Sequence, residues 1–276
     1  MIQYSKQADE RREAGPLECW CLHGAVGTAA DWRGFAKNLA SLGIGSRAVD
    51  LWRFLDCCPM PLPDFAKALN ADASGEVFRG HGRALLGYSM GGRMALHALL
   101  ENNHPWQAAV IISAHPGLEI ETDRTARRAA DAEWATQALA GDWQNFLTAW
   151  NAQPLLSSGP MHDSQASGSL IMRRREIARS FVDWSLGAQE PLWERLNEIK
   201  IPVLWIAGEH DLKFRTLAER AVSLLPNAQL VIAQAAGHRV PWEAASWFAD
   251  QVASFLKLGH LQAIIHGGFL IPRKGQ

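Results

Sequence analysis

Long apolar runs and an excess of charge are both missing from this sequence of 276 residues. No apolar stretch approaches the roughly 18 residues that a membrane-spanning helix needs, so we expect no membrane insertion. A net charge of −1 gives no overall field to attract nucleic acid. Residues 1–13 are polar and charged and lack the apolar segment of a signal peptide. The composition therefore predicts a cytoplasmic protein that binds neither membrane nor nucleic acid.

Cysteine is scarce as well, with four residues in the chain. Cys19 and Cys21 share one apolar segment, and Cys57 and Cys58 are adjacent. Neither pair is placed for an easy disulfide, and none of the four falls in a metal-ligand spacing. We therefore expect no disulfide framework and no bound metal.

Tyrosine is rare, with two residues, whereas the chain has twelve tryptophans and 48% hydrophobic residues. This composition supports a large core, and an aromatic-lined pocket would use tryptophan too. At this length we expect one α/β domain, or one domain with an inserted cap.

The segment Leu-Leu-Gly-Tyr-Ser-Met-Gly-Gly-Arg at 85–93 organises the rest of the chain. It predicts a short strand, a tight turn and a helix, which is the context of a nucleophile elbow at Ser89. Gly87 and Gly91 stand two positions either side of Ser89, where a Cβ would crowd the turn. The amide of Met90 then points to where an oxyanion would form.

Strands and helices alternate along most of the chain. Apolar segments predict strands at 17–22, 46–51, 83–87, 108–112, 202–207 and 229–233, and helical spacing predicts helices at 31–42, 63–70, 94–100, 214–225 and 242–256. Residues 52–63 contain two cysteines and three prolines and predict a surface loop. The alternation predicts an α/β fold, a mostly parallel sheet with helices on both faces.

Strand patterns stop between residues 118 and 188. Amphipathic segments at 123–139, 143–150 and 172–184 predict a helical cap over the carboxyl ends of the strands, with a loop at 157–169. The predicted organisation is a core at 1–117, a cap at 118–188, the rest of the core at 189–257 and a tail at 258–276. The tail has an apolar patch at 261–265 and is expected to be loosely docked or disordered.

Asp211 and His238 each follow a predicted strand, which gives the chain order Ser, Asp, His. A serine hydroxyl at its ordinary pKa is a poor nucleophile or base, so an imidazole must take its proton. Asp211 would fix the tautomer of His238 and stabilise the imidazolium. A His-Gly pair ends the first strand, and the amide of the next residue, Ala25, is the expected second oxyanion donor beside Met90.

Arg93 lies four residues after Ser89, one turn inside the elbow helix. A guanidinium so close to the nucleophile indicates an anionic substrate, held by paired charge-assisted hydrogen bonds. Most arginines of the cap would lie on solvated helix faces, and one or two facing the pocket would complete a polycarboxylate site. The candidates are Arg124, Arg127, Arg128, Arg173, Arg174 and Arg175.

Five motifs carry a resemblance to a known family. They are Leu-His-Gly at 22–24, Gly-Tyr-Ser-Met-Gly-Gly-Arg at 87–93, His-Pro-Gly-Leu at 115–118, Gly-Glu-His-Asp-Leu-Lys-Phe at 208–214 and Ala-Gly-His at 236–238. Across residues 17–256 the chain resembles the 2-succinyl-6-hydroxy-2,4-cyclohexadiene-1-carboxylate (SHCHC) synthases of menaquinone biosynthesis. These are lyases of the α/β-hydrolase fold, so the resemblance implies that fold with a helical cap insertion.

The resemblance also implies roles for matching residues. Ser89, Asp211 and His238 match the catalytic triad. Substrate-contacting positions of the family are matched by Tyr88, Arg93, Arg127, Trp150 and one of three consecutive arginines, for which we take Arg173.

Two departures from the family concern the substrate. The usual Pro-Gly-His-Gly after the second strand is replaced by Trp-Arg-Phe-Leu at 52–55, and the small Ala25 would widen the pocket.

The implied reaction is loss of pyruvate from SEPHCHC, the enolpyruvyl precursor of SHCHC, after proton abstraction. Ser89, activated by His238, would be the base, and the oxyanion hole would hold enolate charge. This needs no metal or organic cofactor. The expected partner is a small anionic polycarboxylate, and the expected state is a monomer or weak homo-oligomer. Two other functions remain open: a carboxylesterase, thioesterase or C–C bond hydrolase with a covalent serine intermediate, and a non-catalytic receptor of the same fold.

Overall fold

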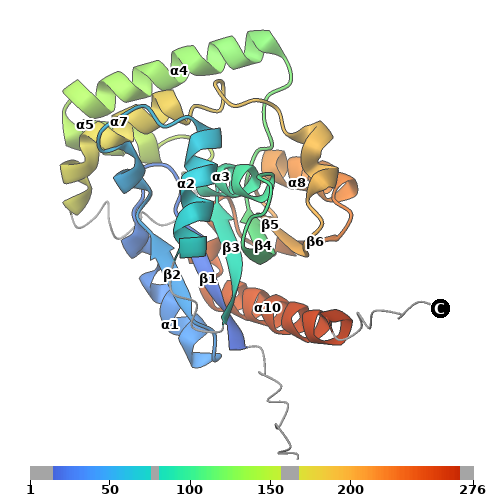
Figure 1. The fold of residues 1–276 in the computed structure, drawn as a ribbon. Coiled ribbons are helices and arrows are strands. Elements are labelled where there is room, and N and C mark those ends of the chain that lie inside the picture. The colour runs from blue at the N-terminus through green and yellow to red at the C-terminus, as the bar shows by residue number, and fades with distance from the viewer. Residues whose placement is uncertain (1–14, 76–80, 157–167, 268–276) are drawn as a thin grey trace, which may run out of the picture.

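Figure 1 shows the computed structural model, which describes residues 15–75, 81–156 and 168–267. The strands of this part of the chain are β1 (Gly15–Leu22), β2 (Ser46–Val49), β3 (His81–Tyr88), β4 (Trp106–Ile112), β5 (Val203–Gly208) and β6 (Ala228–Ala233). They form one sheet in the order β2-β1-β3-β4-β5-β6, and every neighbouring pair is parallel. The carboxyl ends of the strands therefore meet at one edge of the sheet, and the predicted fold class is confirmed.

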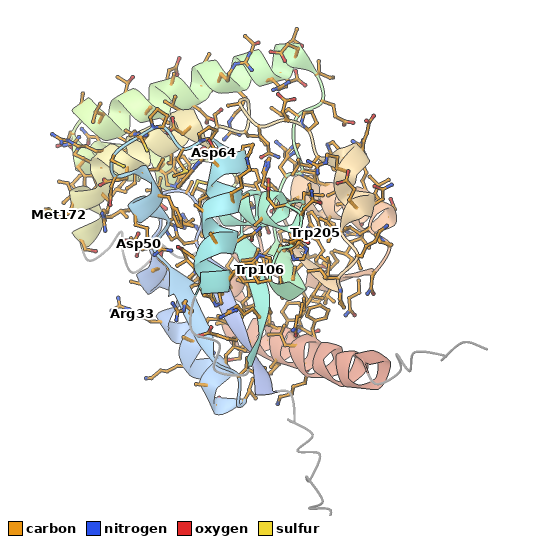
Figure 2. All side chains as sticks on the ribbon, viewed as in Figure 1. Arg33, Asp50, Asp64, Trp106, Met172 and Trp205 are labelled. Carbon is orange, nitrogen blue, oxygen red and sulfur yellow. The ribbon has the colours of Figure 1, made fainter. Side chains whose placement is uncertain are left out.

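Helices cover both faces of the sheet. One face carries α1 (Arg33–Ser41) and α10 (Ala245–Gly267), whose Phe35 and Phe248 rings lie 5.0 Å apart. The other face carries α2 (Leu62–Gly75), α3 (Met90–Leu99) and α8 (Leu212–Leu224). Because both faces are covered, the strands read as nearly continuous apolar runs. Trp106 and Trp205, labelled in Figure 2, are buried in this core.

Four short turns of helix connect these elements: η1 (Ala29–Trp32), η2 (Leu51–Leu55), η4 (Trp193–Glu198) and α9 (Val240–Glu243). Two predicted helices are therefore divided. The one expected at 31–42 is split into η1 and α1, and the one expected at 242–256 is split between α9 and α10.

The segment between β4 and β5 contains α4 (Glu121–Ala140), α5 (Trp143–Asn151), η3 (Ser169–Arg173) and α7 (Arg174–Asp183). Figure 1 shows α4, α5 and α7 together at one end of the molecule, with α4 lying along α7. Arg174 joins the start of α7 to the end of α4, because its guanidinium donates to the backbone carbonyls of Ala138 and Gly141 at 3.0 and 2.9 Å. These helices make the cap that the sequence predicted.

The surface loop predicted from residue 52 was wrong at its start, because residues 51–55 form η2. The Asp50 side chain caps this turn by accepting from the Trp52 amide at 3.1 Å. Leu51, Trp52 and Leu55 are buried, and the indole N–H of Trp52 donates to the Gly27 carbonyl at 2.8 Å. The prolines that indicated a loop all follow this turn, so they do not disturb it.

Residues 258–267, which the sequence assigned to a loosely docked or disordered tail, continue α10 as helical backbone. No proline interrupts residues 258–267, and a pair of adjacent glycines follows only at the end of this segment, at 267–268. Residues 268–276 lie outside the described residues, as do the polar start at 1–13 and residues 157–167 of the predicted cap loop.

Candidate active site

Ser89 lies between β3 and α3, where the elbow was predicted. Its φ of 53° and ψ of −111° are values that non-glycine residues seldom adopt. The Ser89 amide donates to the Ile112 carbonyl at 2.8 Å, which fixes the turn to the neighbouring strand. A Cβ on Gly91 would lie 2.5 Å from the Leu22 carbonyl oxygen, and a Cβ on Gly87 would clash with the Gly91 backbone. Both glycines are therefore required for the elbow to pack.

The Asp211, His238 and Ser89 side chains form a continuous hydrogen-bonded chain. The Nδ1 atom of His238 lies 2.7 Å from Oδ2 of Asp211, and its Nε2 atom lies 3.0 Å from Oγ of Ser89. Asp211 and His238 are buried. With the Nδ1 proton held by Asp211, Nε2 is left to accept the serine proton. The geometry suits proton removal from Ser89 and its return.

The turn after β1 lies directly over the elbow. A Cβ on Gly24 would lie 2.7 Å from the Tyr88 ring and 3.7 Å from Cβ of Ser89. Ala25 is the next residue, and Met90 begins α3, whose first amides have no acceptor within the helix. The Ala25 and Met90 amides thus stay our candidates for the oxyanion hole.

Backbone strain concentrates at this edge of the sheet. Among the described residues, non-glycine residues with positive φ lie just beyond β1, β3, β4 and β6, with Asn103 the one found elsewhere. Such conformations cost on the order of 1–3 kcal/mol each and persist where the surroundings fix them, as they do at active sites. The residues at the edge are Val26, Ser89, Ser113 and Ala235.

Arg93 is buried and reaches from α3 to the segment that follows the cap helices. Its two terminal nitrogens donate to Oε1 of Gln189 and to the Trp184 carbonyl, each at 2.8 Å. Both acceptors are neutral. Burial, and then the Arg127 cation, lower the pKa of Arg93 to about 9. A buried cation with only neutral acceptors gains stability when an anion binds beside it.

Arg127 brings a second positive charge to the same region. Its Nε donates to Oδ1 of Asp131, one turn further along α4, at 2.9 Å. Asp131 is buried and also accepts from the Ser185 hydroxyl at 2.8 Å. About 40% of the Arg127 side chain is exposed, so part of its guanidinium faces solvent. One cation from the core and one from the cap therefore lie near each other.

Tyr88 ends β3, immediately before Ser89. Its ring centroid lies 4.9 Å from that of Trp242 and 5.5 Å from that of His238. Burial raises the pKa of the Tyr88 hydroxyl, so it remains neutral at physiological pH. A neutral phenol can donate a hydrogen bond to a carboxylate.

Trp150 lies near the end of α5 in an aromatic cluster of the cap. Its ring centroid lies 5.2 Å from that of Trp134 and 5.3 Å from that of Phe181. Only 9% of Trp150 is exposed, so a substrate contact would use one edge of its ring.

Arg173 differs from the other predicted contacts, because carboxylates already surround it. Its guanidinium lies 2.9 Å from Asp50, 3.7 Å from Asp56 and 3.6 Å from Glu176. The pairs with Asp50 and Asp56, which flank η2, hold the start of α7 against it. The structure therefore gives Arg173 a cap-anchoring contact that the sequence did not predict.

Two buried side chains near the site are absent from the predicted site residues. Gln189 accepts from Arg93 and donates to the Pro116 carbonyl at 2.9 Å, which orients its amide. Arg239 is 1% exposed and follows His238 directly. Its position next to His238 in the sequence could have indicated Arg239, because a long charged side chain beside the triad histidine is expected to lie near the site.

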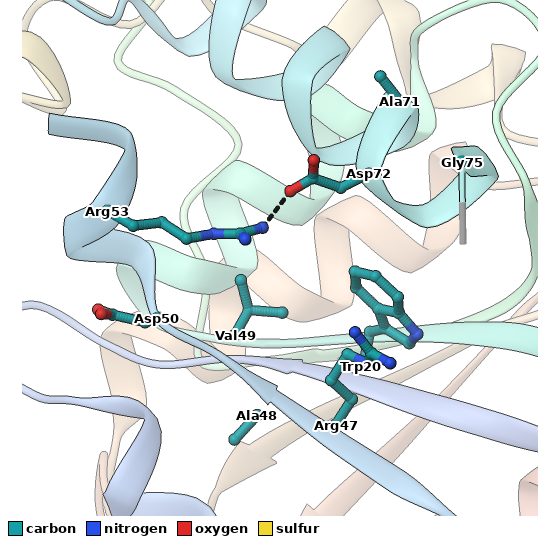
Figure 3. Close-up of a pocket in the computed structure, with 9 residues that line it drawn as sticks. All are labelled: Trp20, Arg47, Ala48, Val49, Asp50, Arg53, Ala71, Asp72 and Gly75. Atoms are coloured by element: carbon teal, nitrogen blue, oxygen red, sulfur yellow. Dashed lines mark hydrogen bonds and ion pairs between the residues drawn. The ribbon is translucent and has the colours of Figure 1, made fainter. Parts of the chain in front are cut away.

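Figure 3 shows a groove of about 540 Å³ at the outer strand β2 and the end of α2. Each of its charged side chains has a partner of opposite charge: Arg53 pairs with Asp72, Arg47 with Glu18 and Asp50 with Arg173. None of the triad residues lines it. The groove therefore offers no exposed, unbalanced charge to recognise an anion, unlike the region around Arg93.

Within the described residues, no helix is long and apolar enough to cross a membrane. The same part of the chain holds no group of three or more His, Cys, Asp or Glu side chains that could bind a metal ion.

Comparison with known families agrees with the observed fold. A model of the alpha/beta hydrolase fold matches residues 21–245. The chain belongs to the α/β-hydrolase fold family. The SHCHC synthase of Pectobacterium atrosepticum is 31% identical over 253 residues, which cover 87% of this chain and 95% of that protein. That of Citrobacter koseri is 31% identical over 178 residues, 63% of this chain and 68% of that protein. Within the fold family, the chain thus belongs to the SHCHC synthase family, as its motifs predicted.

Solved structures share the fold. MenH from S. aureus has a TM-score of 0.76 at 24% identity, and covers 89% of this chain and 95% of its own. A thermophilic esterase from Thermogutta terrifontis has a TM-score of 0.71 at 16% identity, with 90% and 92% coverage.

Proposed function

We propose that this protein is a lyase that releases pyruvate from SEPHCHC to form SHCHC in menaquinone biosynthesis. The observation that carries the proposal is the buried Arg93, one turn beyond the nucleophile and bonded only to neutral acceptors. The nearby Asp131 carboxylate acts on Arg93 but is paired with Arg127, so a substrate carboxylate would supply a negative charge bonded to Arg93 itself. The names of the relatives support the same reaction. We place the enzyme in the cytoplasm, as a monomer or weak homo-oligomer acting on a small polycarboxylate.

In the proposed reaction Ser89 acts as a base. His238 takes the serine proton, and the alkoxide removes the substrate proton next to the succinyl ketone. The electron pair moves into the ring as the C–O bond to the enolpyruvyl group breaks. The departing enolate gains the proton held by His238 and becomes pyruvate, which leaves His238 neutral and Ser89 protonated again. The Ala25 and Met90 amides would hold the charge on the ketone oxygen. Arg93, Arg127 and Tyr88 would bind carboxylates.

The direct test is pyruvate release from SEPHCHC by the purified protein, with and without a chelator. We expect turnover in both, because the triad and the arginines supply the base and the charge stabilisation. His210→Asn serves as a matched control, since His210 is exposed beside Asp211. An enzyme that consumes no SEPHCHC, or that works only after a divalent ion is restored, would refute the proposal.

A serine hydrolase is the second candidate, because the His238 to Ser89 hydrogen bond of 3.0 Å is equally suited to nucleophilic attack. Mass spectrometry during turnover separates the two. The lyase leaves Ser89 unmodified, whereas a hydrolase accumulates an acyl group on it. The same intact triad argues against a non-catalytic receptor.

A further inference from the structure

Arg239 connects three parts of the active site. It follows His238 in the chain, its guanidinium donates to Oδ1 of Asn151 at the end of α5, and it hydrogen-bonds the Tyr88 side chain. Because Arg239 is 1% exposed, it does not reach substrate itself. Any influence on the reaction must therefore act through these neighbours.

The backbone on both sides of His238 is fixed by one carboxylate. Glu243 accepts from the Gly237 amide at 2.5 Å through Oε2 and from the Arg239 amide at 2.9 Å through Oε1. The Glu243 carboxylate thus holds the backbone on both sides of His238 in place. A displacement of Arg239 would move this segment together with its imidazole.

The guanidinium is an unusual choice for a buried position. Burial lowers the pKa of Arg239, which reflects the desolvation cost of its charge. An uncharged side chain of similar size would fill the space without that cost. What distinguishes arginine here is a rigid fork of donors that spans two elements at once.

We propose that Arg239 is a positioning residue that ties cap helix α5, through Asn151, to Tyr88 and to the segment carrying His238. Seating of α5 then sets the alignment of the imidazole with Ser89. The inference rests on the proposed function only for the choice of substrate.

The first experiment needs no knowledge of the substrate. A fluorophosphonate forms a bond from Oγ of Ser89 to phosphorus and releases fluoride, while His238 takes the proton. Its limiting labelling rate therefore reports how well His238 activates Ser89. We expect about a tenfold slower rate for Arg239→Gln, a threefold to fivefold slower rate for Asn151→Ala, and an intermediate rate for Arg239→Lys. The double variant Asn151→Ala/Arg239→Gln should be labelled at most about twofold more slowly than Arg239→Gln, because both changes break the same hydrogen bond.

The second experiment measures SEPHCHC turnover. We expect kcat to fall in parallel with the labelling rate while KM changes less than about threefold, since Arg239 does not touch substrate. Arg195→Gln breaks an arginine contact away from the site, the ion pair with Glu198 within η4, and should leave both rates unchanged.

The outcomes separate the two proposals. Slower labelling without any SEPHCHC turnover in the wild type keeps Arg239 as a positioning residue and rejects the lyase. A lowered Tm with unchanged labelling would reduce Arg239 to a structural residue and overturn the inference. The inference would also be overturned if the fold-reductions in labelling rate of the two single variants multiplied in the double variant. If Arg239→Gln does not fold, Asn151→Ala decides, and a wild-type labelling rate in that variant overturns the inference.

Discussion

The core and the cap position their functional side chains by different means. In the core, Ser89, Asp211 and His238 each follow a parallel strand, so the strand order brings them to one edge. In the cap, arginines stand on helices and take the orientation that a partner gives them. Arg127 pairs with Asp131 on its own helix, whereas Arg173 pairs with Asp50 of the core. Backbone topology therefore predicts a catalytic residue, but the role of a cap arginine depends on which acceptor it meets.

Removing the hydroxyl of Ser89 in the core should have the largest effect. Ser89→Ala is expected to lower kcat on SEPHCHC by at least roughly a thousandfold, because His238 then has no hydroxyl to deprotonate. The Tm should stay within a few degrees of the wild type. Ser41→Ala, at an exposed position on α1, is the control. A Ser89→Ala enzyme with near-normal kcat would place the base elsewhere.

Trp52 tests how firmly the core holds the turn after β1, which carries the candidate oxyanion-hole residue Ala25. Trp52→Ala should lower the free energy of unfolding by about 3–5 kcal/mol, because a large buried ring is lost. Trp52→Phe should cost about 1 kcal/mol, mainly for the bond to the Gly27 carbonyl. Urea denaturation measures both. Equal costs for the two variants would show that the hydrogen bond, and not the packing, dominates.

Arg93 bridges the two regions, and its replacement tests the anionic substrate. Loss of a charge-assisted hydrogen bond costs on the order of 1.5–3 kcal/mol, so Arg93→Ala should lower kcat/KM on SEPHCHC roughly tenfold to a hundredfold. Arg93→Lys lacks the planar fork and should be impaired nearly as much. A small neutral ester, if it is hydrolysed, should be affected little. Equal losses on both substrates would mean that Arg93 only supports the elbow.

His97 on α3 makes the core sensitive to acid. Burial, and then the Arg93 and Arg195 cations, lower its pKa to about 4. In the unfolded chain His97 binds a proton near pH 6.5, whereas in the folded protein it stays neutral down to about pH 4. The free energy of unfolding is therefore at its full value above pH 6.5 and decreases as the pH falls toward 4. The expected loss is about 2 kcal/mol by pH 5.

His97→Phe should flatten this part of the stability profile, measured by urea unfolding at pH 7, 6, 5 and 4. His115, whose pKa burial lowers to about 3, adds a separate loss that the variant keeps. The exposed His210→Asn change should leave the profile as it is. A His97→Phe profile as steep as that of the wild type would assign the acid loss to other groups.

Arg127 and Arg173 should give the smallest effects, and the two effects should differ in kind: one on KM and the other on stability. Arg127→Ala is expected to raise KM for SEPHCHC about tenfold, for a lost contact to a carboxylate. Arg173→Ala should change KM less than twofold and lower stability by up to about 1 kcal/mol, because its ion pairs are partly exposed. Steady-state kinetics and urea unfolding of both variants measure this. A larger KM effect for Arg173→Ala would restore it as a substrate contact.

The sequence predicts features that depend on neighbouring residues better than contacts between residues far apart in the chain. The sheet, the elbow and the chain order of the triad depend on local patterns, and each was read from neighbouring residues. The ion pair of Arg173 with Asp50 joins residues 123 positions apart, and nothing local to either residue indicates it. The same holds for the contact from Arg239 to Asn151. The burial of Trp52 was missed because later prolines dominated the pattern.

The cap leaves the core after Pro116 and rejoins it before Leu192, whose amide donates to the Pro116 carbonyl at 2.8 Å. Its entry and exit points are therefore adjacent, so we expect that the insertion can be exchanged as a unit. A different cap joined at these points would leave the elbow and the triad in place. The Arg93 bond to Trp184 uses a backbone carbonyl, which any residue can supply. Swapping the insertion is consequently a route to new substrate ranges, provided that the replacement keeps an acceptor where Asn151 stands.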